Sequence, residues 1–189
     1  MKKVCLVFSL ILIYSGLFAQ KPREICGIAN LEPYVGTWIY QSNDTIFKIV
    51  LQKSRLNVLN VTFLGLVGSY SLSVGGNVID NYIGSLPDSI TSLQKSKIPD
   101  DLCIWANNTD PNNSSVTPSY MGLLFYDKRK KHFDGNGIPG GILQLLSPHK
   151  MLWQLNEKWA IWFETEGSDK VIEPIGFSVP EHAVMVKEE

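Results

Sequence analysis

The stretch that most constrains the fold is residues 34–40, with the sequence YVGTWIY. Alternate residues of a β-strand point to the same face, so Tyr34, Trp38 and Tyr40 are expected to share one side with the glycine between them. A glycine inside a strand packs nothing itself, and beside a large indole it indicates a bend or a close approach of another backbone. The stretch therefore predicts a curved first strand with Trp38 on its inner face.

Short runs of alternating apolar and polar residues continue downstream, separated by turn residues. In the second run, Phe47, Ile49 and Leu51 fall on one face, and a Gly-Gly-Asn sequence at 75–77 marks a hairpin turn. Strands are expected at residues 44–52, 56–64, 66–74, 78–83, 120–126, 141–146, 150–155, 159–165 and 182–187, with a break at Gly65. About 8–10 strands joined by hairpins predict an all-β, antiparallel up-and-down β-barrel.

The N-terminus has the pattern of a secretory leader. Two lysines near the start precede an apolar run at residues 4–18, and Ala19 offers a small residue for cleavage. The run is shorter than the roughly 20 apolar residues that span a membrane. Residues 1–19 are therefore predicted to be a signal peptide, with no transmembrane segment after its cleavage. Residues 20–189 then form a single barrel domain that is exported, to the periplasm or to the outside of the cell.

Two cysteines remain after cleavage, Cys26 and Cys103. Because an exported protein meets an oxidising compartment, a disulfide between them is expected, and two buried free thiols are the alternative. Cysteines this far apart do not have zinc-ligand spacing, and the three histidines are also scattered. The sequence therefore predicts no metal site and no cofactor.

Residues 84–119 interrupt the strand pattern, because they are rich in Ser, Asn, Asp and Pro. They are predicted to form one long loop. Within the loop, the apolar residues 102–105 are expected to dock on the barrel as a short strand, with Trp105 as the anchor. A lid over the barrel mouth and an inert insertion both stay open as roles for this loop.

The motif Tyr34-x-Gly36-x-Trp38 resembles the first-strand motif of lipocalins, fatty-acid-binding proteins and avidins. In those small antiparallel barrels, this tryptophan closes one end, and lipocalins often plug that end with a helical turn, which we expect at residues 23–30. More broadly, the chain resembles a family of small secreted bacterial proteins of unknown function, including its ending GFSVP at residues 176–180. The resemblance implies a barrel and leaves the activity open.

Large aromatic side chains are the candidates for binding a ligand. They are Trp38, Phe47, Tyr70, Trp105, Trp153 and Trp162. Small barrels either fill their interiors with side chains or hold one ligand, and the mostly apolar interior positions here leave both arrangements open.

No catalytic signature stands out. The basic run 128–132 (KRKKH) is predicted to lie at a solvated loop tip, and the glycine-rich run 135–140 is predicted to be a hairpin loop because a strand follows it. Glu164 and Glu166 share a strand face without an identifiable partner. A net charge of −1 gives no field that would attract nucleic acid, which is not an expected partner.

These observations favour a non-enzymatic, lipocalin-like module that binds a small apolar ligand or an envelope component. The first alternative is a structural or protein-interaction module of the cell envelope with a filled barrel. A hydrolase with an unrecognised site is the second.

Overall fold

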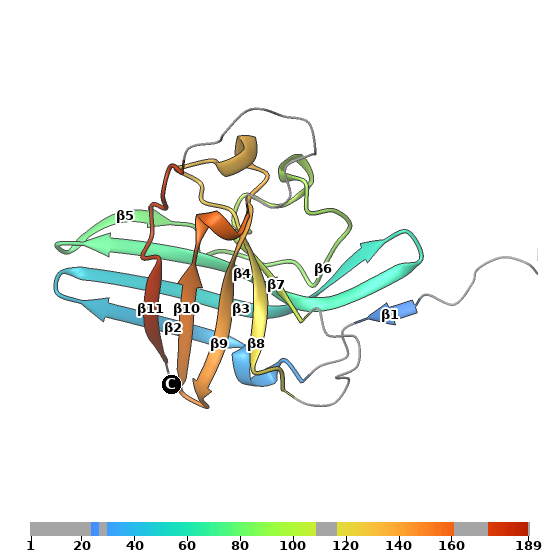
Figure 1. Cartoon of the computed structure of the whole chain (residues 1–189), viewed down its shortest axis with the longest axis horizontal. Helices are drawn as coiled ribbons and strands as arrows, with labels where there is room; N and C mark the ends of the chain where they lie inside the picture. The colour runs from blue at the N-terminus through green and yellow to red at the C-terminus, as the bar shows by residue number, and fades with distance from the viewer. Residues whose placement is uncertain (1–23, 27–29, 109–116, 161–173, 189) are drawn as a thin grey trace, which may run out of the picture.

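The structure is a computed structural model that describes residues 30–108, 117–160 and 174–188, and the backbone of residues 24–26 (Figure 1). These residues form strands β1 (Glu24–Cys26), β2 (Gly36–Ser42), β3 (Thr45–Val58), β4 (Val61–Val74), β5 (Asn77–Asn81), β6 (Ser89–Ile90), β7 (Ile104–Asn107), β8 (Tyr120–Phe125), β9 (Ile138–Ser147), β10 (Lys150–Leu155) and β11 (His182–Lys187). Four short 3-10 turns accompany them, η1 (Glu32–Tyr34), η2 (Lys95–Lys97), η3 (His132–Gly135) and η4 (Glu157–Trp159). Among the residues described, no helix has the length and apolar character needed to cross a membrane.

Eight strands close into a barrel in the order β4-β7-β8-β9-β10-β11-β2-β3, and β3 pairs back to β4. Neighbours in this ring are antiparallel throughout. In Figure 1, β8 to β11 cross the long β3 and β4 strands at a steep angle. The predicted all-β up-and-down barrel is therefore confirmed. Strands β1, β5 and β6 pair outside the ring, with β4, β4 and β3 respectively.

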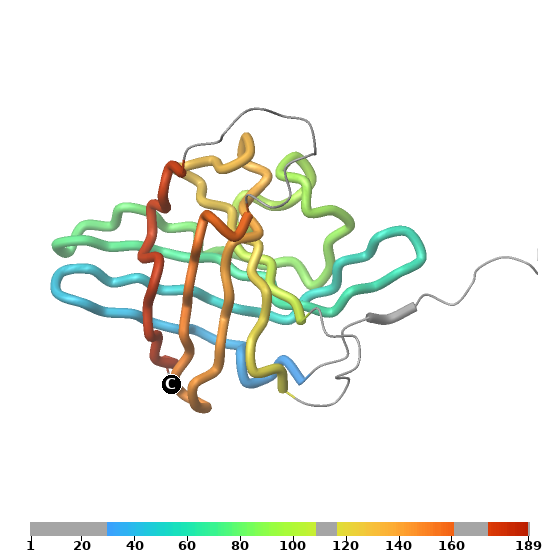
Figure 2. Tube along the Cα trace, viewed as in Figure 1, coloured from blue at the N-terminus to red at the C-terminus, as the bar shows by residue number. Residues whose placement is uncertain are grey.

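Strands β3 and β4 form one long hairpin, paired from Thr45 with Val74 to Val58 with Val61. Figure 2 shows its tip projecting beyond the barrel. The break predicted at Gly65 is wrong, because this residue lies inside β4. A Cβ atom there would lie 2.8 Å from the Trp105 ring and 2.7 Å from a backbone oxygen. The glycine therefore marks a close approach of β7 and not the end of a strand.

The first barrel strand begins later than the aromatic spacing predicted. Tyr34 lies in turn η1, and β2 starts at Gly36. The Nε1 of Trp38 donates to the Tyr34 carbonyl at 2.8 Å, and the Tyr34 hydroxyl donates to the Pro118 carbonyl at 2.9 Å. The helical turn expected at residues 23–30 is wrong where the structure describes this stretch, because residues 24–26 form strand β1. The helical turn is η1 instead, where Pro33 lies in the first turn, a position that proline favours.

Strand β7 comes from inside the predicted long loop and completes the barrel. Successive side chains of β7 point to opposite faces of the sheet. Ile104 and Ala106 therefore join the apolar cluster inside the barrel, and Trp105 joins a second apolar cluster outside it. The outer cluster also contains Ile90, Ile98 and Leu102, from the segment that leads into β7. The expected docking of Trp105 is confirmed, and this segment covers the outside of the barrel.

Candidate functional site

Four of the predicted aromatic candidates meet inside the barrel: Trp38, Phe47, Tyr70 and Trp153 are all buried in one cluster. The Phe47 ring lies 5.3 Å from that of Trp153 and 6.0 Å from that of Tyr70, measured between centroids. Phe125 lies 5.4 Å from Trp153 and 5.6 Å from Tyr70. These distances are those of directly packed aromatic pairs, so the rings fill the space between them with one another.

The remaining candidates lie elsewhere. Trp105 faces the outer cluster, and Trp162 is outside the described residues, as are Glu164 and Glu166. Cys103 is a free, buried cysteine, and burial raises the pKa of its thiol to about 12, so it is not a nucleophile at neutral pH. The side chain of Cys26 is not described, and its disulfide with Cys103 stays a prediction.

At the end of β8, the carboxylate of Asp127 joins two distant parts of the chain. Its Oδ1 accepts from the amides of Arg129 at 3.0 Å and Lys130 at 2.9 Å, and from the Ser178 hydroxyl at 2.7 Å. Its Oδ2 accepts from the Ser178 amide at 2.7 Å. Asp127 is 3% exposed, and four hydrogen bonds satisfy it.

Glu157 binds the residues that directly precede Ser178 in the chain. Its two carboxylate oxygens accept from the amides of Ile175 at 2.9 Å and Gly176 at 2.8 Å. The ring of Phe177 lies 4.9 Å from that of His132, whose Nε2 is 3.6 Å from Glu157. The GFSVP ending is therefore a fixed closure of this barrel end. Carboxylates, a serine and a histidine meet here, as a hydrolase would require. However, the carboxylates of Asp127 and Glu157 already accept hydrogen bonds from backbone amides of the protein.

The basic run at residues 128–132 is only in part the solvated tip that the sequence predicted, because its three central residues are exposed and its two ends are not. The Nζ of Lys128 is buried without a hydrogen-bond partner in the described residues, and His132 is 5% exposed. Burial lowers the pKa of Lys128, and the nearby ammonium of Lys95 lowers it further. The sequence missed this burial because η2, where Lys95 lies, is brought beside Lys128 only by the tertiary fold.

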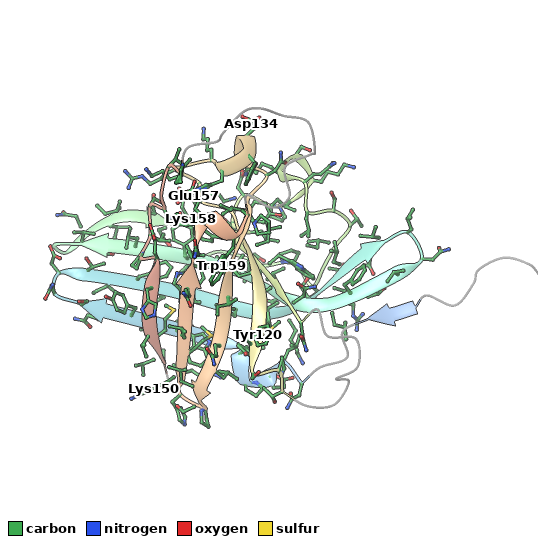
Figure 3. All side chains as sticks on the ribbon, viewed as in Figure 1. Tyr120, Asp134, Lys150, Glu157, Lys158 and Trp159 are labelled. Atoms are coloured by element: carbon green, nitrogen blue, oxygen red, sulfur yellow. The ribbon has the colours of Figure 1, made fainter. Side chains whose placement is uncertain are left out.

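A cavity of about 260 Å³ opens beside this buried lysine. Its lining residues are Lys95, Tyr126, Asp127, Lys128, Lys131, Asp134 and Gly135. We call it the rim pocket. Figure 3 places Asp134 and Glu157 toward the barrel end opposite Tyr120 and Lys150. The rim pocket was not predicted, although an aspartate followed by a basic turn at the end of a strand is a detectable turn signal.

The loop that borders the rim pocket has an unusual backbone. Lys131, Phe133 and Asp134 have φ angles of 53°, 50° and 57°, in the left-handed region that residues other than glycine rarely adopt. Such residues cost of order 1–3 kcal/mol each and cluster at ligand-binding and catalytic sites. The surrounding fold must therefore hold this loop in place.

A second hollow of about 490 Å³ lies near the β3–β4 hairpin and is lined by Leu31, Lys53, Ser54, Arg55, Leu64, Gly65 and Asp88. Lys53 forms an ion pair with Glu32, and the carboxylate of Asp88 accepts a hydrogen bond from the Gln52 amide. Within the part of the chain that the structure describes, no three His, Cys, Asp or Glu side chains converge as a metal site.

No curated protein and no solved structure matches this chain. Residues 1–188 match a family described as a family of unknown function (DUF6705), which agrees with the resemblance to a family of small proteins without an assigned activity. A match over nearly the whole length shows that the closed barrel, its pinned ending and the rim pocket all lie within the matched region. The chain belongs to this family of unknown function, DUF6705.

Proposed function

We propose that the protein is an exported, non-catalytic binding module, in which the barrel is a rigid support and the ligand binds at the rim pocket. The observation that carries this proposal is the buried ammonium of Lys128, which borders a cavity and has no hydrogen-bond acceptor among the described residues. A buried charge without a partner is costly. A ligand that supplies the acceptor removes that cost.

The packed interior favours ligand binding at the rim pocket over ligand binding inside the barrel. Phe47, Tyr70, Phe125 and Trp153 form a closed circuit of four ring contacts, with centroids 5.3–6.0 Å apart. A lumenal apolar ligand would have to separate these rings and lose their contacts. The leader at residues 1–19 supports export, because its charged start, apolar run and small residue have the order of a signal peptide.

Hydrogen-exchange mass spectrometry tests the binding site with a panel of small anionic, neutral sugar and apolar compounds. We expect an anionic compound to slow exchange in residues 126–137 and to raise the melting temperature. A Phe47→Leu variant, changed only inside the barrel, should keep that protection. Slowed exchange confined to β2, β3 and β10, or no effect of any compound on residues 126–137, would contradict binding at the rim.

A second candidate is a protein-interaction module, which the projecting β3–β4 hairpin favours. Leu59 at its tip is 91% exposed and Val58 is 40% exposed. A photoreactive amino acid at position 59 should form a defined crosslink with an envelope protein in cells, whereas one at exposed Asn77, in the opposite hairpin, should not. Equal crosslinking at both positions, or none at position 59, would count against this role.

A further inference from the structure

The rim pocket is lined by three lysines and two aspartates, and its hydrogen bonds and ion pairs among the described residues leave two of the lysines without a partner. Asp127 has its acceptor positions filled by two amides and by Ser178, and Lys95 pairs with Asp100 at 3.1 Å. Within the described residues, the buried ammonium of Lys128 and the exposed ammonium of Lys131 have no hydrogen-bond or ion-pair partner. An incoming anion would therefore meet two cations with unfilled hydrogen-bonding capacity, in a cavity that the carboxylates of Asp127 and Asp134 also line.

The type of cation indicates the type of anion. The pocket presents lysines, whose ammonium groups are compact point charges with three donors each, and not the planar fork of arginine that fits a carboxylate with two parallel bonds. Several ammonium groups around one cavity suit an oxyanion whose oxygens point in different directions. A phosphate group has this geometry and the higher charge.

The rest of the cavity has room for an organic group. Its volume of about 260 Å³ far exceeds the roughly 30 Å³ that one water occupies in the liquid. The ring of Tyr126 forms part of the wall and is fixed, because its hydroxyl donates to the Leu93 carbonyl at 2.6 Å. An immobile aromatic wall beside a charged end is the usual arrangement for a small amphiphilic ligand.

We propose that the rim pocket binds a phosphomonoester, with the phosphate held by Lys128 and Lys131 and the organic group against Tyr126. This inference rests on the proposed function and names its ligand class. The strained loop at residues 131–134 is held in place before binding, so little ordering entropy is lost when the phosphate arrives.

Isothermal titration calorimetry tests the inference with inorganic phosphate and glycerol 3-phosphate at constant ionic strength. We expect saturable binding of both, tighter for the ester. The Lys128→Met and Lys131→Ala variants should each lose about tenfold or more in affinity, since each removes one charge-assisted contact. Lys97→Met is the matched control, because this exposed lysine of η2 lies outside the pocket, and it should bind like the wild type.

Cosedimentation with vesicles that contain phosphatidic acid distinguishes a lipid head group from a soluble ester. Vesicle binding that Lys128→Met abolishes would place the phosphate on a lipid, whereas binding of glycerol 3-phosphate alone would place it on a soluble molecule. Both results support a phosphomonoester site.

The inference is overturned if neither phosphate compound binds, or if Lys128→Met binds them like the wild type. In that case, slowed exchange at residues 126–137 with another compound of the panel would leave the proposed function standing. If no compound protects these residues, both the inference and the proposed function fail. Because the Lys128→Met variant replaces a buried charge by an apolar chain of similar length, it is expected to fold.

Discussion

The carboxylate of Asp127 accepts hydrogen bonds of 2.7 Å from both the amide and the hydroxyl of Ser178, which lies 51 residues later in the chain. The same carboxylate caps the turn after β8 through the amides of Arg129 and Lys130. One side chain therefore couples the loop that borders the rim pocket to the segment that enters β11. The shape of the pocket and the closure of this barrel end depend on the same group.

An Asp127→Asn variant should lose about 2–3 kcal/mol of unfolding free energy, because an amide cannot accept all four hydrogen bonds and those bonds are to a charge. Urea denaturation measures this loss. The matched control is Asp44→Asn at an exposed turn, which should stay within about 0.5 kcal/mol of the wild type. Equal stability of the two variants would show that Asp127 does not hold the closure.

Gly65→Ala should destabilise the barrel by roughly 1–3 kcal/mol, because the added methyl group would meet the Trp105 ring at 2.8 Å and the Ala106 carbonyl oxygen at 2.7 Å. Gly122→Ala is the control in β8, since its Cβ would meet its nearest neighbour, the Asn107 carbonyl oxygen, at 3.8 Å, an ordinary contact. Thermal unfolding compares the two variants. A Gly65→Ala protein as stable as Gly122→Ala would contradict the close packing of β4 on β7.

Lys128→Met should raise the melting temperature, corresponding to about 1 kcal/mol, because it removes an ammonium that is buried without a partner. Differential scanning calorimetry without phosphate measures the shift. Lys97→Met should change stability by less than about 0.5 kcal/mol. A gain in stability combined with a loss of phosphate binding is the expected result for a residue retained for binding. A lower melting temperature for Lys128→Met would show that its charge stabilises the fold.

Stability should fall as the pH rises above 9. In the reduced protein, burial raises the pKa of the Cys103 thiol from 9.0 to about 12 and that of the Tyr34 hydroxyl from 10.0 to about 12. In this range the unfolded chain loses these protons and the folded chain keeps them, so the stabilisation is complete below pH 9 and decreases toward pH 12. Urea denaturation at several pH values measures the decrease, and stability that rises through this range would contradict it.

Lys128 should act in the opposite direction at alkaline pH. Its pKa is lowered from 10.5 in the folded protein, so its contribution to stability increases with pH until the unfolded lysine also loses its proton. The Lys128→Met variant should therefore show a steeper alkaline loss of stability than the wild type. A parallel loss in the two proteins would mean that the Lys128 ammonium is not perturbed.

Much of the sheet was predictable, because its signals are local. Phe47, Ile49 and Leu51 occupy alternate positions of β3, and all three are buried in the barrel. The glycines at 75 and 76 have φ angles of 59° and 78°, the conformation that a tight hairpin turn requires. Strands β10 and β11 have the bounds that periodicity and turn residues indicated. Alternation and turn chemistry are properties of neighbouring residues, so they can be read without knowing the fold.

By itself, then, the sequence determined the barrel class, the inward-facing residues of the first hairpin and the leader pattern. The tertiary structure decided that β7 belongs to the ring, that Gly65 continues a strand, that the Lys128 ammonium and the His132 ring are buried, and that Asp127 meets Ser178. Each of these depends on which distant segment covers a residue. Local periodicity does not carry that information, because the same polar run is solvated or buried according to whether another segment folds over it.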